Sequence, residues 1–215
     1  RNNRNLVMFP HSNDDILRVL DLCAGNCSFP MLDNGYVYLT DAFSHDSVRA
    51  IHVLRGDQLG VQAQVLIADT KMIDGIARDL TDDARLLMET FWPGALSLSL
   101  RPQRGLSWDL GDDGKLDWIS VRIPQHEFLR ALLTETGPLA CASAAPAGQL
   151  PLSQVSQLNL QGHEIALVVD AGGIAPTQPS THVEIDLSQT RLLREGAARL
   201  KALRRHGPSA AAMAG

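Results

Sequence analysis

Strand-like and helix-like segments alternate along most of this chain. The clearest strand signal is Leu96-Ser97-Leu98-Ser99-Leu100, where apolar and polar residues alternate strictly, as in a strand that is buried on one face. Residues 61–68 have a continuous apolar centre, which is typical of a buried strand. Amphipathic helical segments separate such strands, and the sequence contains neither a Gly-x-Gly-x-x-Gly nor a Walker loop. The pattern predicts an α/β fold in which helices pack around a mixed, twisted sheet.

Local signals place the individual elements. Capping residues, apolar spacing and terminating Gly or Pro residues predict a first helix between His11 and Gly25 and further helices over residues 44–54, 70–77, 81–91 and 127–136. Strands are expected over residues 37–39, 61–68, 96–100, 118–123, 139–143, 165–170, 182–187 and 190–193. The Pro, Gly and Asp residues of segment 101–115 indicate a hairpin or excursion between two of these strands.

The length and apolar content favour one domain with one substantial core. The chain has 215 residues, of which 45% are hydrophobic. Residues 1–207 are therefore predicted to form a single domain, and residues 208–215, which carry no core residues, a mobile C-terminal tail. No apolar run reaches the roughly 18 to 20 residues that a bilayer-spanning helix needs. The charged segment from Arg1 to Asn5 has no apolar stretch behind it, so a secretory signal is not expected.

Charge and cysteine usage narrow the class further. The formal net charge of −5 argues against a surface that is coated with nucleic acid, although it is compatible with a local basic patch. Three cysteines, Cys23, Cys27 and Cys141, are too few for a disulfide framework, and no His or Cys spacing indicates a metal site. A protein of the reducing cytoplasm is the expectation.

Four segments resemble motifs of the YrdC-like family, in the same order and with similar separations. Residues 91–98, Phe-Trp-Pro-Gly-Ala-Leu-Ser-Leu, resemble the Trp-Pro-Gly-Ala-Leu-Thr strand entry, and residues 121–126, Val-Arg-Ile-Pro-Gln-His, resemble Arg-Ile-Pro-x-His. Residues 137–148 resemble the stretch that carries Ser-Ala-Asn-x-Ser-Gly. Residues 179–184 with 193–196 are similar to Ser-Thr-Val-Val-Asp and Leu-Arg-Glu-Gly. Each motif alone is weak, but together they extend over residues 25–197.

The resemblance implies a fold and an activity. Members of this family share an open, twisted α/β sheet with a large concave, positively lined cavity. Their enzymes join L-threonine, bicarbonate and ATP into threonylcarbamoyl-AMP with release of pyrophosphate, and the product serves threonylcarbamoyladenosine formation in tRNA. The implied cofactors are ATP and Mg²⁺. The implied partners are L-threonine and bicarbonate, tRNA or double-stranded RNA, and tRNA-modification proteins, with no membrane involved.

The chemistry explains which residue types the site requires. Attack of a carboxylate on the α-phosphate of ATP gathers negative charge, so cations and hydroxyl or N–H donors must surround the phosphates. By resemblance, Arg55 and Ser143 take catalytic roles, and Arg122 contacts the threonine carboxylate. The full set of implied contacts is Arg55, Ser143, Ser180 and Arg194 for the nucleotide and Arg122, His126 and Thr181 for the substrate.

Several positions depart from the family pattern. Residues 55–57, Arg-Gly-Asp, stand where Lys-Gly-Arg is expected, so Asp57 reverses the local charge. Leu59 stands where a further base is expected, and Ala145 and Ala147 replace Asn and Ser. Residues 30–36 match the Pro-Thr-x-Thr-Val-Tyr-Gly segment poorly. These losses support an alternative hypothesis: a catalytically degenerate paralogue that binds RNA, a nucleotide or a protein partner.

Other interpretations stay open at this point. Arg122 is equally compatible with a structural ion pair, His126 with a helix cap, and Ser180 with a turn. Arg101, Arg104 and Lys115 of the central excursion are candidates for substitute cations at the cavity rim. A third function, carbamoyl transfer to a different acceptor, is disfavoured because proteins of that kind carry additional domains.

Overall fold

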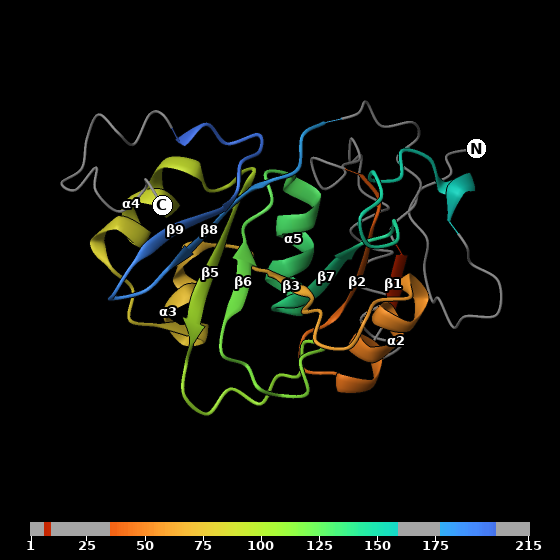
Figure 1. Cartoon of the computed structure of the whole chain (residues 1–215), viewed down its shortest axis with the longest axis horizontal. Helices are drawn as coiled ribbons and strands as arrows, with labels where there is room; N and C mark the ends of the chain where they lie inside the picture. Colours follow the sequence, from red (N-terminus) through yellow and green to blue (C-terminus); the bar gives the residue numbers. More distant parts are fainter. Residues whose placement is uncertain (1–6, 10–34, 159–176, 201–215) are drawn as a thin grey trace.

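The strands of this computed structural model, which describes residues 7–9, 35–158 and 177–200, form one mixed sheet. Their order is β1-β2-β7-β3-β6-β5-β8-β9, and the short strand β4 pairs with β5 outside this path. Figure 1 shows β1 and β2 at one end of the sheet and the β8–β9 hairpin at the other. The strands are β1 Val7–Phe9, β2 Val37–Asp41, β3 Gln64–Leu66, β4 Ala77–Arg78, β5 Leu96–Pro102, β6 Ile119–Arg122, β7 Leu139–Ser143, β8 Thr181–Ile185 and β9 Thr190–Arg194.

Parallel and antiparallel pairs alternate irregularly across the sheet. The pairs β1–β2, β3–β6 and β5–β8 are parallel, whereas β2–β7, β3–β7, β5–β6, β4–β5 and β8–β9 are antiparallel. The sheet is open rather than closed into a barrel, because the end strands β1 and β9 are not paired with each other in the order. The predicted mixed α/β fold is therefore confirmed.

The helices between residues 44 and 136 lie within one residue of the predicted ranges, whereas the 3₁₀ turn of residues 155–157 was not predicted. They are α2 His45–Arg55, the 3₁₀ turn η1 Thr70–Met72 that leads into α3 Ile73–Ile76, α4 Asp82–Phe91, α5 Glu127–Thr136 and the 3₁₀ turn η2 Val155–Gln157. The side chain of Thr81 caps α4 by accepting a hydrogen bond from the Ala84 N–H at 3.1 Å. Gly56 follows α2 in the left-handed conformation that glycine tolerates best.

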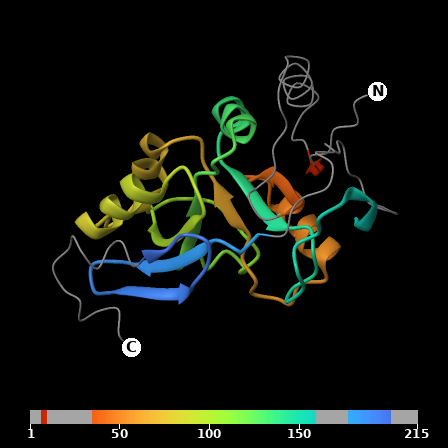
Figure 2. The same cartoon turned by 90° about the horizontal axis from the view of Figure 1, so that it is seen from above.

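The largest apolar cluster covers one face of the sheet. Alternate residues of the central strands, such as Leu98, Val121 and Val65, pack there against buried residues of α3 and α4, including Ile73 and Leu87. A second cluster lies on the opposite face, where Leu66 and Leu139 contact α5. Figure 2 shows α5 on one side of the molecule and the β8–β9 hairpin on the other.

The sequence-based prediction for β5 was wrong in one respect. The strict alternation predicts one buried and one solvated face, yet Ser97 is 0% exposed and Ser99 is 6% exposed. The reason is that this face does not meet bulk solvent directly. It lies within a polar wall, where both hydroxyls form hydrogen bonds with other side chains.

The remaining element predictions divide into three groups. Strands near residues 37–39, 96–100, 118–123, 139–143, 182–187 and 190–193 are confirmed, as are all four helices predicted between residues 44 and 136. Segment 61–68 forms a shorter strand than expected, because β6 and β7 pair with it only at residues 64–66. The helix of residues 11–25, the strand of residues 165–170 and the tail of residues 208–215 lie outside the described residues.

Within the described part of the chain, no helix is long and apolar enough to cross a membrane.

Candidate functional site

A cavity of about 640 Å³ opens over the face of the sheet that carries Gln64, Ser99 and Ser120. Its wall combines strand residues with the C-terminal end of α2 and the segments around residues 148–151 and 177–180. Val37 and Cys141 belong both to this wall and to the apolar cluster under α5, so the cavity adjoins that cluster. The polar and charged lining residues are His52, Arg55, Asp57, Gln62, Gln64, Ser99, Ser120, Arg122, Ser143, Gln149, Thr177, Ser180, His182 and Arg194.

A hydrogen-bond network joins four strands and loops behind this wall. Gln64 Nε2 donates to Ser97 Oγ at 2.8 Å and to Ser120 Oγ at 3.0 Å. Ser97 Oγ also lies 2.8 Å from Ser180 Oγ, which accepts from Arg194 Nη2 at 3.1 Å. Because every link joins side chains from different segments, the network fixes the orientation of the hydroxyl groups that face the cavity.

Arg194 is the cation at the β9 side of the cavity. Its Nε donates to the carbonyl oxygen of Ser180 at 3.0 Å, which adds a second bond to the same residue. Among the described residues no carboxylate forms an ion pair with Arg194. The guanidinium is therefore held in place by Ser180, and no acid of the described residues neutralises its charge.

Arg122 lies in the floor of the cavity and is only 1% exposed. Its Nε donates to the carbonyl oxygen of Gly94 at 2.7 Å, and the Gly94 N–H donates to the carbonyl oxygen of Ile123 at 3.0 Å. The Trp-Pro-Gly and Arg-Ile-Pro segments are thus joined directly. The buried Arg122 side chain therefore stabilises this junction in the floor of the cavity.

The C-terminal end of α2 forms a tightly bonded corner of the cavity. Arg55 Nε donates to Asp57 Oδ2 at 2.8 Å, and its Nη1 donates to the carbonyl oxygens of Ser143 and, at 2.7 Å, Ala145. The hydrogen bond between the Ser143 hydroxyl and the Ala145 N–H, at 3.2 Å, closes the same turn. Arg55 therefore connects α2 to the end of β7.

Asp57 completes this corner and is fully buried. Its side chain is 0% exposed, and Oδ2 also lies 2.9 Å from His52 Nδ1. Burial by itself would raise the pKa of Asp57, but hydrogen bonds from Arg55 and His52 hold it below its usual value. Asp57 Oδ1, in contrast, has no hydrogen-bond partner among the described residues. The acid that replaces the expected base is thus ionised and buried, and Arg55 and His52 both bond its Oδ2.

His182 lies next to Arg194 on the cavity wall. Its Nε2 is 2.8 Å from Ser99 Oγ, and burial followed by the charge of Arg194 lowers its pKa to about 4. The imidazole is accordingly neutral near pH 7 and contributes hydrogen-bonding capacity rather than charge.

The structure brings together five of the seven residues that the resemblance assigns to the site. Arg55, Arg122, Ser143, Ser180 and Arg194 all line the cavity. His126 and Thr181 are not part of the cavity wall that the described residues form.

The two remaining residues have local structural partners. His126 Nδ1 accepts from the Phe128 N–H at 3.2 Å and so caps α5, and burial lowers its pKa to about 4. The Thr181 hydroxyl donates to the carbonyl oxygen of Ala198 at 2.6 Å and accepts from the Gly196 N–H at 3.0 Å. Thr181 therefore attaches the end of the described chain to β8.

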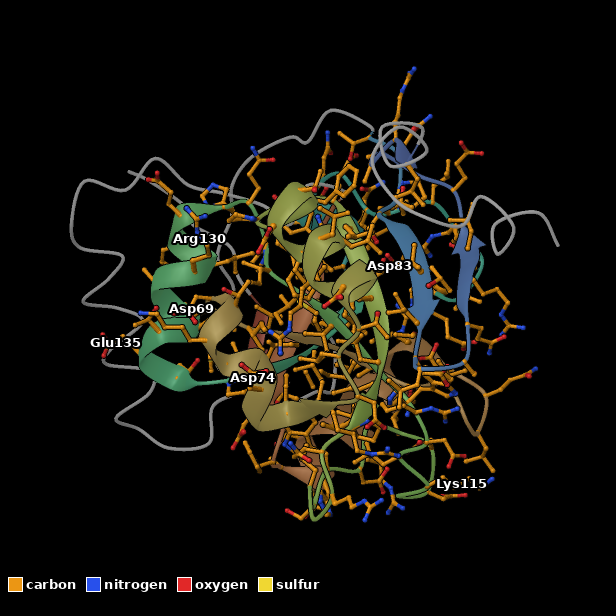
Figure 3. The ribbon with its side chains drawn as sticks, turned by 90° about the vertical axis from the view of Figure 1, so that its left-hand side faces the viewer. Asp69, Asp74, Asp83, Lys115, Arg130 and Glu135 are labelled. Atoms are coloured by element: carbon orange, nitrogen blue, oxygen red, sulfur yellow. The ribbon has the colours of Figure 1, made fainter. Side chains whose placement is uncertain are left out.

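The candidate substitute cations lie elsewhere. Arg101 pairs with Asp186 at 3.0 Å and stacks over the Trp118 ring at 3.7 Å. Neither Arg101 nor Arg104 nor Lys115 is part of the cavity wall, and Figure 3 shows Lys115 at the far end of the molecule from Arg130 of α5. Leu59 is 95% exposed and is not part of this cavity wall either.

Sequence reasoning missed Gln64, Ser99, Ser120, His52 and His182 as wall residues. A signal for three of them was present. Ser99 and Ser120 are polar residues at alternate positions of strands whose other positions are apolar, and Gln64 precedes an apolar strand core. Polar residues that alternate along adjacent central strands indicate a polar cavity over the sheet as readily as they indicate solvent.

Comparison with known proteins decides the family. Residues 32–196 match the family that combines Sua5, YciO and YrdC, which is described as telomere recombination. The chain belongs to the Sua5/YciO/YrdC family. A relative from Mycobacterium tuberculosis, with the provisional name threonylcarbamoyl-AMP synthase, is 34% identical over 174 residues, which cover 80% of this chain and 79% of the relative. Threonylcarbamoyl-AMP synthase of Bacillus subtilis is 30% identical over 135 residues, covering 61% of this chain and 38% of that protein.

Solved structures of Sua5/YciO/YrdC proteins share the fold. Sua5 from P. abyssi in complex with L-threonine superposes with a TM-score of 0.74 at 21% identity, covering 93% of this chain and 60% of that one. The chain thus spans less than two thirds of that protein's length. YciO from E. coli superposes with a TM-score of 0.67 at 19% identity and covers 92% and 98% of the two chains.

Proposed function

We propose that this protein is a threonylcarbamoyl-AMP synthase, which forms threonylcarbamoyl-adenylate from L-threonine, bicarbonate and ATP. The observation that carries the proposal is the common cavity. Five residues from separate segments line it: Arg55, Arg122, Ser143, Ser180 and Arg194. The chain is also 34% identical to the Mycobacterium tuberculosis relative that has the provisional name threonylcarbamoyl-AMP synthase.

The cations of the cavity suit a triphosphate and an amino acid together. Ser180 and Arg194 form one end, where the Arg194 guanidinium has no acidic partner among the described residues and can donate to phosphate oxygens, as can the Ser180 hydroxyl. Arg55 and Ser143 form the other end, at β7, and Arg122 lies in the floor between them. A volume of about 640 Å³ falls within the range of small-molecule sites.

The proposed reaction has two bond-forming steps. The amino nitrogen of L-threonine adds to the carbon of bicarbonate, and water leaves, which gives a carbamate. A carbamate oxygen then attacks the α-phosphorus of ATP, the bond from that phosphorus to the bridging oxygen breaks, and pyrophosphate leaves with the electron pair. Negative charge grows on the phosphoryl oxygens, so the fixed guanidinium groups of Arg122 and Arg194 stabilise the transition state more than the ground state.

ATP brings Mg²⁺ with it in this proposal. Magnesium bound to substrate phosphates usually has only one or two protein ligands, and it prefers oxygen ligands. The cavity wall offers hydroxyl oxygens, such as those of Ser120 and Ser180, and side-chain amide oxygens. The ion would neutralise charge on the phosphates. The residues of this chain would orient the triphosphate and exclude water.

The biological setting follows from the product. Threonylcarbamoyl-adenylate is an activated carbamoyl donor for tRNA modification, so we propose that tRNA-modification proteins of the cytoplasm consume it. The net charge of −5 gives no general affinity for RNA, and tRNA contact would require a local patch.

A pyrophosphate-release assay tests this function. Purified protein with ATP and Mg²⁺ should release pyrophosphate only when L-threonine and bicarbonate are both present, and mass spectrometry should detect threonylcarbamoyl-adenylate. Calorimetry on the same sample measures ATP binding. Binding of ATP without threonine-dependent pyrophosphate release would overturn the synthase and favour the degenerate binding paralogue.

A further inference from the structure

His52 meets an acceptor at each of its two ring nitrogens. Its Nδ1 lies 2.9 Å from Asp57 Oδ2, and its Nε2 lies 2.8 Å from the carbonyl oxygen of Leu110. A carbonyl oxygen only accepts hydrogen bonds, and so does the carboxylate of Asp57, since its pKa stays below the usual value despite burial. A neutral imidazole has one N–H and would turn a lone pair toward one of these oxygens. Both contacts are satisfied together only when both nitrogens carry a hydrogen and the ring is an imidazolium.

The helix and the loop around His52 hold these acceptors in place. His52 lies in the last turn of α2, where the negative end of the helix dipole favours a cation. The Leu110 carbonyl oxygen is fixed by a second donor, the Ala63 N–H, at 2.8 Å. The next residue, Gly111, lets the loop approach the ring, because a side chain there would collide with His52 Nε2. The two contacts of the ring therefore belong to a rigid local arrangement.

His52 also borders a second cavity, of about 520 Å³, beside α2. His52 and Asp57 are the wall residues that the two cavities share. The other titratable or charged residues of the second wall are His45, Asp46, Arg49, Asp109 and Asp113. Carboxylates outnumber the arginine among them, and this excess favours a positive charge on the ring.

The charge of His52 changes the balance at this corner of the first cavity. Arg55 and Asp57 together have a formal charge of 0, where the Lys-Gly-Arg pattern has +2, and an imidazolium raises the sum to +1. Asp57 Oδ2 receives a hydrogen bond from each cation, so it does not neutralise Arg55 alone. Arg55 Nη2 forms no hydrogen bond with the described residues and is not fully buried. This group of a wall residue can therefore donate to a ligand in the cavity.

We propose that His52, as an imidazolium, replaces the positive charge that Asp57 removes, so that Arg55 holds a phosphate of the bound nucleotide. His52 acts through Asp57 and Arg55 and is thus a positioning residue. The identity of the nucleotide as ATP rests on the proposed function. The substitute cation lies in α2 rather than in the central excursion of residues 101–115.

NMR of the imidazole nitrogens tests the charge of His52 directly. In the ¹⁵N-labelled full chain at about pH 7, without ATP, both ring nitrogens of His52 should carry a hydrogen and have the chemical shifts of an imidazolium. The spectrum of the His52→Gln variant assigns these signals, because they are then missing. A neutral ring with one unprotonated nitrogen would overturn the inference, whether or not the protein is a synthase.

Two substitutions separate the charge of His52 from its packing. His52→Gln removes the charge, so ATP affinity measured by calorimetry should fall about tenfold. His52→Lys keeps a positive charge beside Asp57 and should bind ATP within about threefold of the wild type. Equal losses in the two variants would overturn the inference, because a lost packing contact would then explain both.

His45→Gln is the matched control. His45 also connects α2 to the central excursion, since its Nε2 lies 2.7 Å from the Ser107 carbonyl oxygen, but it is not part of the first cavity wall. This variant should change ATP affinity by less than about twofold. A loss as large as that of His52→Gln would show that the bonds between helix and loop matter rather than the charge, and would overturn the inference.

The pyrophosphate assay separates this inference from the proposed function. If His52→Gln weakens ATP binding as expected but the wild type releases no pyrophosphate with threonine, only the synthase function fails. Threonine-dependent pyrophosphate release together with equal ATP affinities of the wild type and His52→Gln would overturn only the role of His52.

Discussion

Arg55 and Asp57, two residues apart at the C-terminal end of α2, form an ion pair of 2.8 Å inside the cavity wall. The pair is nearly dry, since the Arg55 side chain is 10% exposed and that of Asp57 is 0% exposed. Asp57 thus does not simply remove a positive charge from the site. It holds Arg55 in the orientation from which the guanidinium bonds the turn after β7.

Removal of Arg55 should destabilise the fold more than removal of an exposed arginine. Arg55→Ala leaves the Asp57 charge buried and deprives the Ser143 and Ala145 carbonyls of a donor, so the free energy of unfolding should fall by about 3 kcal/mol or more. Arg85, which forms an exposed pair with Asp74, is the control, and Arg85→Ala should cost less than about 1 kcal/mol. Urea unfolding measures both, and equal effects would contradict a structural role for the Arg55–Asp57 pair.

Arg194 should bind the phosphates of ATP. Arg194→Gln should weaken ATP binding about tenfold, because a desolvated charge-assisted contact to phosphate is lost. Arg191 lies on the same strand but pairs with Glu184 at 2.9 Å and is not part of the cavity wall. Arg191→Gln should therefore leave ATP affinity nearly unchanged in calorimetry. The assignment fails if the two variants lose affinity equally.

Gly196 should not tolerate a side chain. A Cβ at this position would lie 2.1 Å from the Pro179 carbonyl oxygen and 2.7 Å from the Ser180 carbonyl carbon. Gly196→Ala must displace this backbone, so we expect a loss of about 1 to 3 kcal/mol in stability and weaker ATP binding through the shifted Ser180. Gly75→Ala meets no atom within 4 Å and should be neutral or slightly stabilising. Thermal unfolding and ATP titration of both variants distinguish these outcomes.

Stability should fall as pH decreases from about 6.5 to about 4. The folded pKa of His182 is lowered to about 4 by burial and then by Arg194, so over this interval the unfolded chain binds a proton that the folded chain does not. The contribution of His182 to the free energy of unfolding is fully present above the unfolded pKa of about 6.5, and it decreases by at most about 3 kcal/mol toward pH 4. His126 titrates over the same interval for the same principal reason, burial.

Replacing His182 with a neutral residue isolates its contribution to the pH dependence of the free energy of unfolding. Urea unfolding at several pH values between 4 and 7 should give a smaller pH slope for His182→Gln than for the wild type, with the remainder due to His126 and other groups. An unchanged slope would show that His182 does not titrate as its burial predicts.

The family and much of the fold could be predicted from the sequence, and the site only in part. Thr81, Gly137 and the apolar spacing of α4 and α5 are local signals, and these helices appear where such signals place them. Five motif residues proved to share one cavity. The alternation of β5 predicted burial on one face only, yet Ser99 is buried as well, because alternation alone does not distinguish a solvated face from one that lines a polar cavity.

The sequence by itself therefore determined the element types, the order of the motifs and the family, because helix caps, periodicity and motifs are properties of neighbouring residues. Only the tertiary structure decided what the polar residues contact. Arg55 meets Ser143 across 88 positions, Ser97 meets Ser180 across 83, and Thr181 meets Ala198 across 17. Hydrogen bonds over such separations depend on how the strands are ordered in the sheet, and that order leaves no local pattern in the chain.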